Sequence, residues 1–419
     1  MKAGSVPSVL YTFLLPHTSP SKVRPHVATI RPRANRLRIA LQRLNPASSV
    51  PAGRRLFLTT MTSKQSHHQD QLLRRVPSAL NVPPMLVQPG VEQLDSPTTV
   101  PENAAFPQST FTGPRLDDQK RRMPQCIAHR GYKAKYPENT MAAFKGAIEA
   151  GAQAIETDLH ITKDEVVVIS HDPTLKRVFG RQDRIIDLTW KEIEDVRTTD
   201  PPHERMPKLS DLLEWLAAPG NEEIWCLLDI KLDNDADAIM RLIGKTIEEV
   251  RPAASRAWRD RVVMGIWAAK YLPLAQKYVP GFPVMHIGFS TSYARHFFNV
   301  PNVGFNMLLP ILIAPGGQRF LHDARQVHHR QVLTWTVNDE DRMEWCIRRQ
   351  LNGVMTDDPP KFLKVCERFD EREPEGIMPL TWRSYYDVFR LWIWISIAAL
   401  LYRKKLQPVA SRELIKTHD

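Results

Sequence analysis

The sequence predicts an α/β protein built on a closed (β/α)8 barrel, and two observations support this prediction. From Cys126 onward, short apolar runs alternate with helical patterns, as parallel strands joined by crossover helices require. Eight such runs fall within about 250 residues, the usual size of this barrel. They are Cys126–His129, Ala154–Asp158, Ile224–Ile230, Val262–Trp267, Val284–Phe289, Val303–Met307, Val332–Val337 and Gly353–Thr356.

One further apolar run does not fit a βα repeat. Val166–Ser170 follows the preceding strand too closely for a crossover helix, so we expect an antiparallel hairpin. We expect Thr162 to pair with Glu165. That register would place His171 opposite Glu156.

The barrel is expected to span residues 123–370, with different sequence on either side. Residues 1–64 form a basic leader. Residues 65–122 are rich in Pro, Gln, Ser and Thr and predict a disordered linker, so the N-terminal extension as a whole is expected to lack a fold. Residues 385–405 predict a C-terminal apolar, membrane-associated helix.

The leader carries the whole charge excess of the chain. Eleven Lys and Arg residues precede Asp70, the first acid, and the formal net charge is +11. The remainder is formally neutral, so we expect no nucleic-acid partner. An Arg-rich, acid-free leader with a short amphipathic stretch at Leu37–Leu44 is typical of mitochondrial targeting. The alternatives are a disordered leader or a later start, at Met61 or Met123.

The cysteines argue against two kinds of site. They are widely spaced and lack a CxxC pair, so neither a zinc site nor a disulfide framework is expected, and a reducing compartment fits them. They are Cys126, Cys226, Cys346 and Cys366.

Carboxylates gather at the predicted carboxyl ends of two strands, where such barrels place their active sites. Glu156 and Asp158 are two residues apart and share one strand face. Asp229 and Lys231 share a face of the next strand and point at the same barrel mouth. Three carboxylates without His or Cys ligands favour one hard divalent cation, Mg²⁺ or Ca²⁺.

These residues lie within motifs that occur in a specific order. The run resembles the glycerophosphodiester phosphodiesterase family, over about residues 124–370, and so implies a TIM-type barrel of the phospholipase C-like phosphodiesterases. The first motifs are His129-Arg130-Gly131, Pro137-Glu138-Asn139-Thr140, Glu156-Thr157-Asp158 and His171-Asp172. The later ones are Leu228-Asp229-Ile230-Lys231, Trp335-Thr336-Val337-Asn338 and Gly353–Pro359.

The resemblance implies the central roles. His129 and His171 would be the general acid and base, although either histidine alone would more often be structural. Arg130 and Lys231 would hold the phosphoryl oxygens. The implied reaction is substrate-assisted: a glycerol hydroxyl attacks phosphorus, a cyclic phosphate forms, and water opens it.

Other matched residues would lie around this centre. Glu138 and Asn139 would contact glycerol or support the site edge, and Trp335 would pack on the glycerol or in the barrel core. The family normally has Glu where Asp229 stands, which puts the choice of ion in question. Residues expected to brace the rim are Asn338, Thr356 and Asp357.

The C-terminal segment bears on the size of the substrate. Leu391–Tyr402 has no charges and is flanked by Arg390 and by Arg403–Lys405. As a helix it would rise only about 18 Å, short of the roughly 30 Å hydrocarbon core, so we expect it to lie in one leaflet. The alternative is a helix packed on the barrel. If the helix lies in one leaflet, we expect a membrane-bound enzyme in mitochondria, the endoplasmic reticulum or lipid droplets.

The combination most resembles the phosphatidylglycerol-specific phospholipase C branch of the family. Lys135–Thr140, Gly265-Ile266-Trp267 and Thr356–Pro359 carry this finer resemblance. It implies hydrolysis of phosphatidylglycerol to diacylglycerol and glycerol phosphate. One alternative is a phosphodiesterase for soluble, deacylated glycerophosphodiesters, and another is an inactive lipid-binding barrel.

Overall fold

The computed structural model describes residues 106–314, 316–372, 389–390, 393 and 397. Eight parallel strands close into the predicted barrel, because β3 pairs with β11 on one side and with β4 on the other. The strands, in barrel order, are β3 (Gln125–His129), β11 (Gly353–Thr356), β10 (Val332–Trp335), β9 (Gly304–Leu308), β8 (Val284–Gly288), β7 (Val262–Ile266), β6 (Trp225–Ile230) and β4 (Ala154–Ile161).

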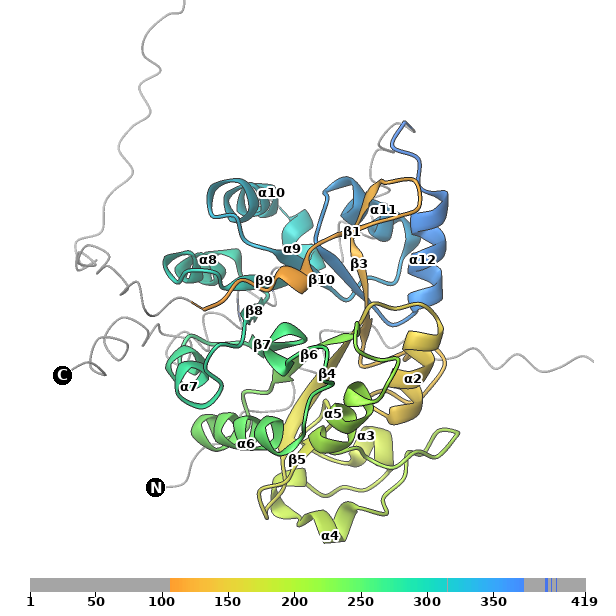
Figure 1. The fold of residues 1–419 in the computed structure, drawn as a ribbon, viewed down its shortest axis with the longest axis vertical. Coiled ribbons are helices and arrows are strands. Elements are labelled where there is room, and N and C mark those ends of the chain that lie inside the picture. The colour runs from red at the N-terminus through yellow and green to blue at the C-terminus, as the bar shows by residue number, and fades with distance from the viewer. Residues whose placement is uncertain (1–105, 315, 373–388, 391–392, 394–396, 398–419) are drawn as a thin grey trace, which may run out of the picture. The chain divides into compact units, whose positions relative to one another are not determined.

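Helices surround these strands, as Figure 1 shows. They follow the strands in the repeating order expected for crossover connections. The helices are α2 (Met141–Glu149), α3 (Lys176–Phe179), α4 (Trp190–Ile193), α5 (Leu209–Ala217), α6 (Ala236–Glu249), α7 (Tyr271–Tyr278), α8 (Thr291–Ala294), α9 (Leu309–Ile313), α10 (Gly317–His322), α11 (Glu340–Arg348) and α12 (Pro359–Arg368).

Strand alternation divides the core into two layers. Side chains such as Ile127, Leu227 and Leu333 fill the barrel interior, while their neighbours along each strand pack against the helices. The four cysteines are buried thiols. Because the interior is packed with apolar side chains, polar groups of the strands gather at the barrel mouth.

The predicted hairpin exists, but its predicted register was wrong by one residue. β5 (Val167–Ile169) runs antiparallel to β4 and pairs Ile161 with Val167. Glu165 adopts a φ of 64°, so the turn needs one residue more than a pairing of Thr162 with Glu165 allows. β5 ends at Ile169, and His171 therefore lies beyond the strand rather than opposite Glu156.

The predicted linker was also wrong in its last part, residues 106–122. These residues form a short 3-10 turn and a small hairpin of β1 (Arg115–Leu116) and β2 (Arg122–Met123). Phe111 packs edge-on against Trp225, and Asn302 donates to the Phe106 carbonyl. These contacts join the segment to the barrel ahead of β3.

The remaining predictions for the tails concern residues that are described in small part or not at all. The leader and residues 65–105 lie outside the described residues. Of the predicted helix at 385–405, only Phe389, Arg390, Ile393 and Ile397 are described, and they are helical and exposed. Among the described residues, no helix has the length and apolar character needed to cross a membrane.

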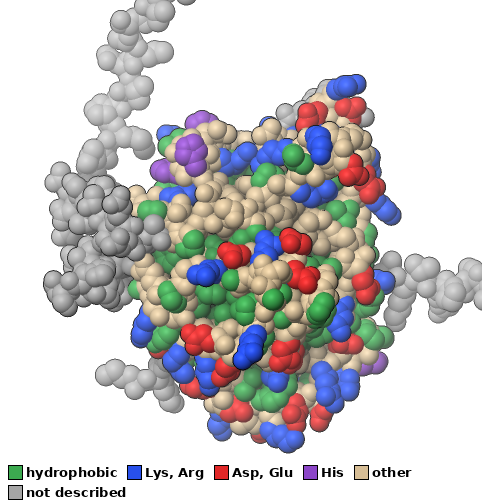
Figure 2. Space-filling model, in the orientation of Figure 1, with side chains coloured by type: hydrophobic (Ala, Val, Ile, Leu, Met, Phe, Trp, Pro, Cys, Tyr) green, Lys and Arg blue, Asp and Glu red, His purple; other side chains and the backbone are tan. Residues whose placement is uncertain are grey.

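Charges of both signs are interspersed over the face shown in Figure 2. Surface ion pairs among the described residues include Arg205 with Asp195 and Arg241 with Glu165. This mixture agrees with the formal neutrality of the chain after its leader.

A substitution at Gly131 would test how closely the chain after β3 packs against α2. The φ of Gly131 is 84°, and a Cβ there would lie 2.6 Å from the Ala143 carbonyl carbon. We expect Gly131→Ala to destabilise the fold by about 3 kcal/mol, from backbone strain and overpacking. Gly220→Ala is the control, because Gly220 also has positive φ but nothing within 4 Å of its Cβ position. Urea unfolding measures both, and equal losses would contradict the steric argument.

Candidate active site

Three buried carboxylates meet at the barrel mouth. Each of Glu156, Asp158 and Asp229 offers an oxygen atom within 4.8 Å of the others. β4 and β6 bring them together because Asp158 pairs directly with Asp229 in the parallel ladder, while Glu156 lies two residues earlier on the same face of β4. The prediction that the two strands present their acids to one mouth is confirmed.

Lys231 and Trp267 organise two of these acids. The Lys231 ammonium lies 2.6 Å from Asp158 Oδ1 and 2.6 Å from Asp229 Oδ2. The Trp267 indole N–H donates to the other oxygen of Asp229, at 2.6 Å. Asp229 is thus held on both of its oxygens by groups just after the ends of β6 and β7.

Arg130 links the first strand to the carboxylates. Its guanidinium contacts Glu138 at 3.0 Å and Asp158 at 3.2 Å, and its backbone N–H donates to Glu156 Oε2 at 3.0 Å. Arg130 and Asn139 both adopt positive φ, and the Asn139 N–H donates to the Arg130 carbonyl. Such backbone conformations cost energy and persist where surrounding contacts determine them.

Asn139 is therefore placed against the acids rather than at an outer edge. Its side-chain N–H donates to Asp158 Oδ2 at 2.7 Å, and its carbonyl oxygen accepts from the Thr157 hydroxyl at 2.9 Å. Glu138 is only 6% exposed and is engaged by Arg130 and Arg177. The structure thus places both residues in positions that brace the site.

Each of the two histidines has its Nδ1 atom held by a carboxylate. His129 Nδ1 lies 2.7 Å from Asp357 Oδ1, and His171 Nδ1 lies 2.8 Å from Asp172 Oδ1. Asn338 in turn donates to Asp357 Oδ2, which confirms that this rim is braced. Because a carboxylate accepts, Nδ1 donates and Nε2 is left for other contacts.

Burial and neighbouring charges set the protonation of these groups. Burial, together with Arg130 and Lys231, lowers the pKa of His171 to about 3. Burial and Arg130 also lower the pKa of His129. Neutral imidazoles with Nδ1–H bound to carboxylates can accept a proton at Nε2.

Burial and neighbouring charges raise the pKa of one of the acids and lower that of another. Burial and the neighbouring Asp158 and Asp229 raise the pKa of Glu156 well above its usual value. Burial also acts to raise the pKa of Asp158, but Lys231 and Arg130 outweigh it and hold that pKa well below the usual value. Arg130 and Lys231 together therefore do not offset the mutual repulsion of the three acids at Glu156.

The cluster fits a divalent cation. An all-oxygen donor set of three converging carboxylates is what Mg²⁺ or Ca²⁺ binds, and the raised pKa of Glu156 marks negative charge that the two nearby cationic side chains leave uncompensated. Asp229 takes part although its side chain is shorter than the glutamate expected there. The residues do not select between the two ions.

The opposite side of the mouth is apolar. Trp267, Phe289, Leu308 and Trp335 come from the carboxyl ends of four consecutive strands, β7 to β10, and Ile311 of α9 packs with them. Trp335 stacks edge-on against Trp267, with ring centroids 5.6 Å apart, and donates to the Asn306 carbonyl. It thus forms part of a packed aromatic wall beside the acids.

Some contacts and residues of the site did not follow from the sequence patterns. Asp172 was part of a predicted motif and Asp357 was an expected rim residue, but their pairing with the histidines was not predicted; Asp172 follows His171 directly, whereas Asp357 lies 228 residues from His129. Arg177 contacts both Asp172 and Glu138 from a segment with no matched motif. Trp267 was noted only as a strand end.

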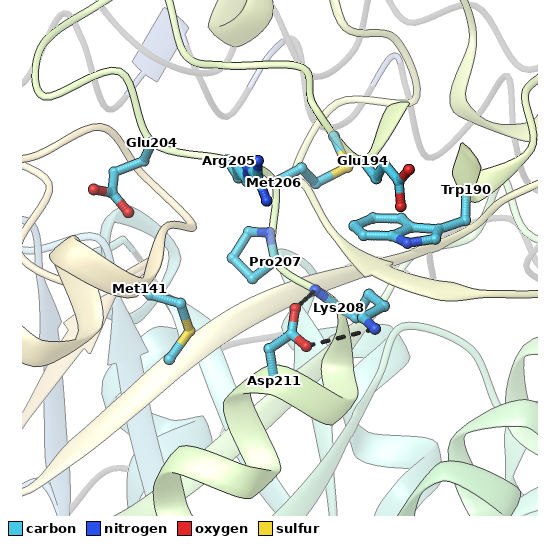
Figure 3. Close-up of a pocket in the computed structure, with 9 residues that line it drawn as sticks. All are labelled: Met141, Trp190, Glu194, Glu204, Arg205, Met206, Pro207, Lys208 and Asp211. Carbon is cyan, nitrogen blue, oxygen red and sulfur yellow. Dashed lines mark hydrogen bonds and ion pairs between the residues drawn. The ribbon is translucent and has the colours of Figure 1, made fainter. Parts of the chain in front are cut away.

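A separate cavity of about 320 Å³ lies between α4, the start of α5 and Met141 (Figure 3). Asp211 contacts the backbone N–H and the ammonium of Lys208 along its lining. None of the lining residues belongs to the cluster of histidines and acids. The cavity is therefore distinct from the candidate active site.

Comparisons with known proteins agree with this chemistry. A model of the glycerophosphoryl diester phosphodiesterase family matches residues 129–361. A Bacillus altitudinis glycerophosphodiester phosphodiesterase is 25% identical, covering 58% of this chain and 99% of that protein. The human protein named lysophospholipase D GDPD1 is 26% identical, covering 60% and 88%. An Oleispira antarctica phosphodiesterase solved with the product sn-glycerol-3-phosphate has a TM-score of 0.50 at 18% identity, covering 58% and 97%, and shares the fold.

Metal binding should stabilise the protein, because the three carboxylates repel one another without it. At 100 times its dissociation constant, Mg²⁺ or Ca²⁺ is expected to raise the free energy of unfolding by about 2.7 kcal/mol. Asp158→Asn should remove most of this gain, whereas Asp195→Asn, the same change at an exposed acid, should keep it. Thermal unfolding with and without each ion measures the effect, and equal stabilisation of both variants would exclude the cluster as the site.

Proposed function

This chain belongs to the glycerophosphoryl diester phosphodiesterase family, and we propose that its barrel mouth hydrolyses the phosphodiester bond of a glycerol-bearing diester. It is accordingly a phosphoric diester hydrolase. The observation that carries the assignment of the site is the convergence of two carboxylate-held histidines, three acids and two cations. Glycerophosphodiester phosphodiesterase is the activity that the named relatives support.

The proposed mechanism divides the chemistry among these side chains. One of His129 and His171, neutral at Nε2, accepts the proton of the glycerol 2-hydroxyl as that oxygen attacks phosphorus, and the other, protonated on both ring nitrogens in the substrate complex, donates its Nε2 proton to the departing alkoxide. The resulting cyclic phosphate is opened by water with the two roles exchanged. Arg130 and Lys231 bind the phosphoryl oxygens. A divalent cation held by Glu156, Asp158 and Asp229 would offset negative charge on those oxygens.

A lipid diester, phosphatidylglycerol, is the finer proposal. Its headgroup carries the vicinal hydroxyl that the mechanism uses, and its glyceride would leave as diacylglycerol. The apolar wall of Trp267, Phe289 and Trp335 offers a surface beside the phosphate site to the apolar part of such a substrate.

The C-terminal segment supports the same substrate class. Phe389, Ile393 and Ile397 are each helical and exposed, and a helix with this four-residue spacing would present them on one face. Exposed apolar side chains on one face are typical of helices that lie in a membrane interface. We propose a membrane-surface attachment through this helix, in mitochondria, the endoplasmic reticulum or lipid droplets. The competing substrate is a soluble, deacylated glycerophosphodiester.

Both histidines should be required for turnover. His129→Ala and His171→Ala are expected to lower kcat by at least about 10³-fold, because each removes a proton-transfer group. His322→Ala is the control, since that side chain is 66% exposed and pairs with Asp323. Glycerol phosphate release from glycerophosphocholine with added Mg²⁺ or Ca²⁺ reports activity. Substantial turnover by either folded alanine variant would overturn the assignment.

Product identity should separate the substrate classes. On liposomes containing phosphatidylglycerol, we expect diacylglycerol and glycerol phosphate, whereas cleavage on the other side of phosphorus would give phosphatidic acid and glycerol. Removal of residues 389–419 should lower activity on liposomes at least about tenfold, through lost membrane binding, and leave hydrolysis of glycerophosphocholine unchanged. Intact liposomes beside consumed glycerophosphocholine would refute the lipid proposal.

A further inference from the structure

Arg177 contacts both Asp172, which pairs with His171, and Glu138, which binds the Arg130 guanidinium. Its Nε atom lies 2.7 Å from Asp172 Oδ2, while the other oxygen of Asp172 holds His171. Its two terminal nitrogens lie 2.8 and 2.7 Å from the two oxygens of Glu138. The guanidinium therefore contacts two carboxylates on different sides of the site.

The second histidine is connected to the same glutamate. Lys133 lies 3.7 Å from Glu138 Oε2 and 3.7 Å from Asp357 Oδ2, and Asp357 holds His129. These contacts are longer than those of Arg177, which lie at 2.7 to 2.8 Å. The shorter contacts are therefore those of Arg177, which lead through Asp172 to His171.

The exposed fractions of the side chains show that Glu138 is buried and that Arg177 reaches it from the protein surface. The Glu138 side chain is 5% exposed, whereas that of Arg177 is 46% exposed. Arg177 belongs to α3, in the irregular segment between β5 and α5, so it reaches the buried acids from a part of the chain that the barrel does not require.

We propose that Arg177 is a positioning residue that sets the orientation of His171. Asp172 can direct His171 Nε2 at the substrate only while its own carboxylate is held, and Arg177 fixes the oxygen that His171 does not use. The planar fork of an arginine satisfies Asp172 and Glu138 together, which a lysine ammonium cannot do in the same geometry. Small misplacement of a proton-transfer group costs up to about 10²-fold in rate. The inference rests on the proposed role of His171 in phosphodiester hydrolysis.

Arg177→Ala should lower kcat by about 10- to 100-fold while KM changes by less than about threefold, because the bound substrate meets a misoriented histidine. Arg177→Lys should recover only a minor part of the loss. Arg181→Ala is the matched control, since Arg181 lies four residues away, is 38% exposed and pairs with Asp183 rather than with the site. It should retain kcat within about twofold.

Two readouts distinguish positioning from a general structural effect. Added ethylguanidinium, at concentrations that leave the wild type unaffected, should raise kcat of Arg177→Ala and leave that of Arg181→Ala unchanged. In a double-mutant cycle, Arg177→Ala should add less than about threefold to the loss caused by Asp172→Asn, because both act through His171.

The assay is hydrolysis of glycerophosphocholine and of phosphatidylglycerol liposomes by the full chain with added Mg²⁺. Unchanged kcat in Arg177→Ala, equal losses in Arg181→Ala, or multiplicative losses in the double variant would each overturn the role of Arg177. If Arg177→Ala does not fold, Arg177→Lys decides, and wild-type kcat in that variant refutes the proposal. Inactivity of the wild type and Arg181→Ala on both substrates would instead refute the proposed function.

Discussion

The mutual repulsion of three buried carboxylates is the constraint on which the mouth of this barrel depends. Glu156, Asp158 and Asp229 are brought together by the β4–β6 register, in surroundings that disfavour each charge. Burying an acid without a partner is costly, so the neighbouring positions must supply cations and donors. Arg130 and Lys231 do so from the ends of β3 and β6, and the charge left over accounts for a divalent cation as the remaining partner.

The two histidines are likewise held by partly buried carboxylates. Each donates its Nδ1–H to a carboxylate, one from the end of β11 and one from the adjacent residue in the chain. This fixes which ring nitrogen faces the substrate, while burial and Arg130 lower the pKa of both imidazoles. The acids that hold the histidines are therefore distinct from those that would hold the metal, and Glu138 lies between the two sets.

The sequence was sufficient to predict where the barrel strands lie and which residues stand at their carboxyl ends, because apolar periodicity and local motifs encode both. It did not reveal contacts that depend on barrel closure, such as Asp357 with His129, since these join β11 to β3 across most of the chain. The hairpin register was wrong because the turn uses Glu165 in a left-handed conformation, which residue type alone did not indicate. Residues 106–122 lack periodicity, yet single side chains such as Phe111 tie them to the barrel. Arg177 was missed for a similar reason, because its segment is irregular.

The order of strands around the barrel divides the mouth into two chemical halves. The ends of the neighbouring strands β11, β3, β4 and β6 carry His129, the acids and the cations, and His171 follows β5, which pairs with β4, whereas β7 to β10 carry the aromatic and aliphatic wall. Trp267 belongs to both halves, because its N–H holds Asp229 while its ring packs against Trp335. A phosphodiester has the same two-sided character when one of its alcohols is a glyceride. The ionic half then determines which bond to phosphorus is broken, and the apolar half determines which alcohol can lie beside it. Within this wall Trp267, Leu308 and Ile311 are buried and only Phe289 and Trp335 are partly exposed, so an apolar arm of such a substrate would meet these two rings.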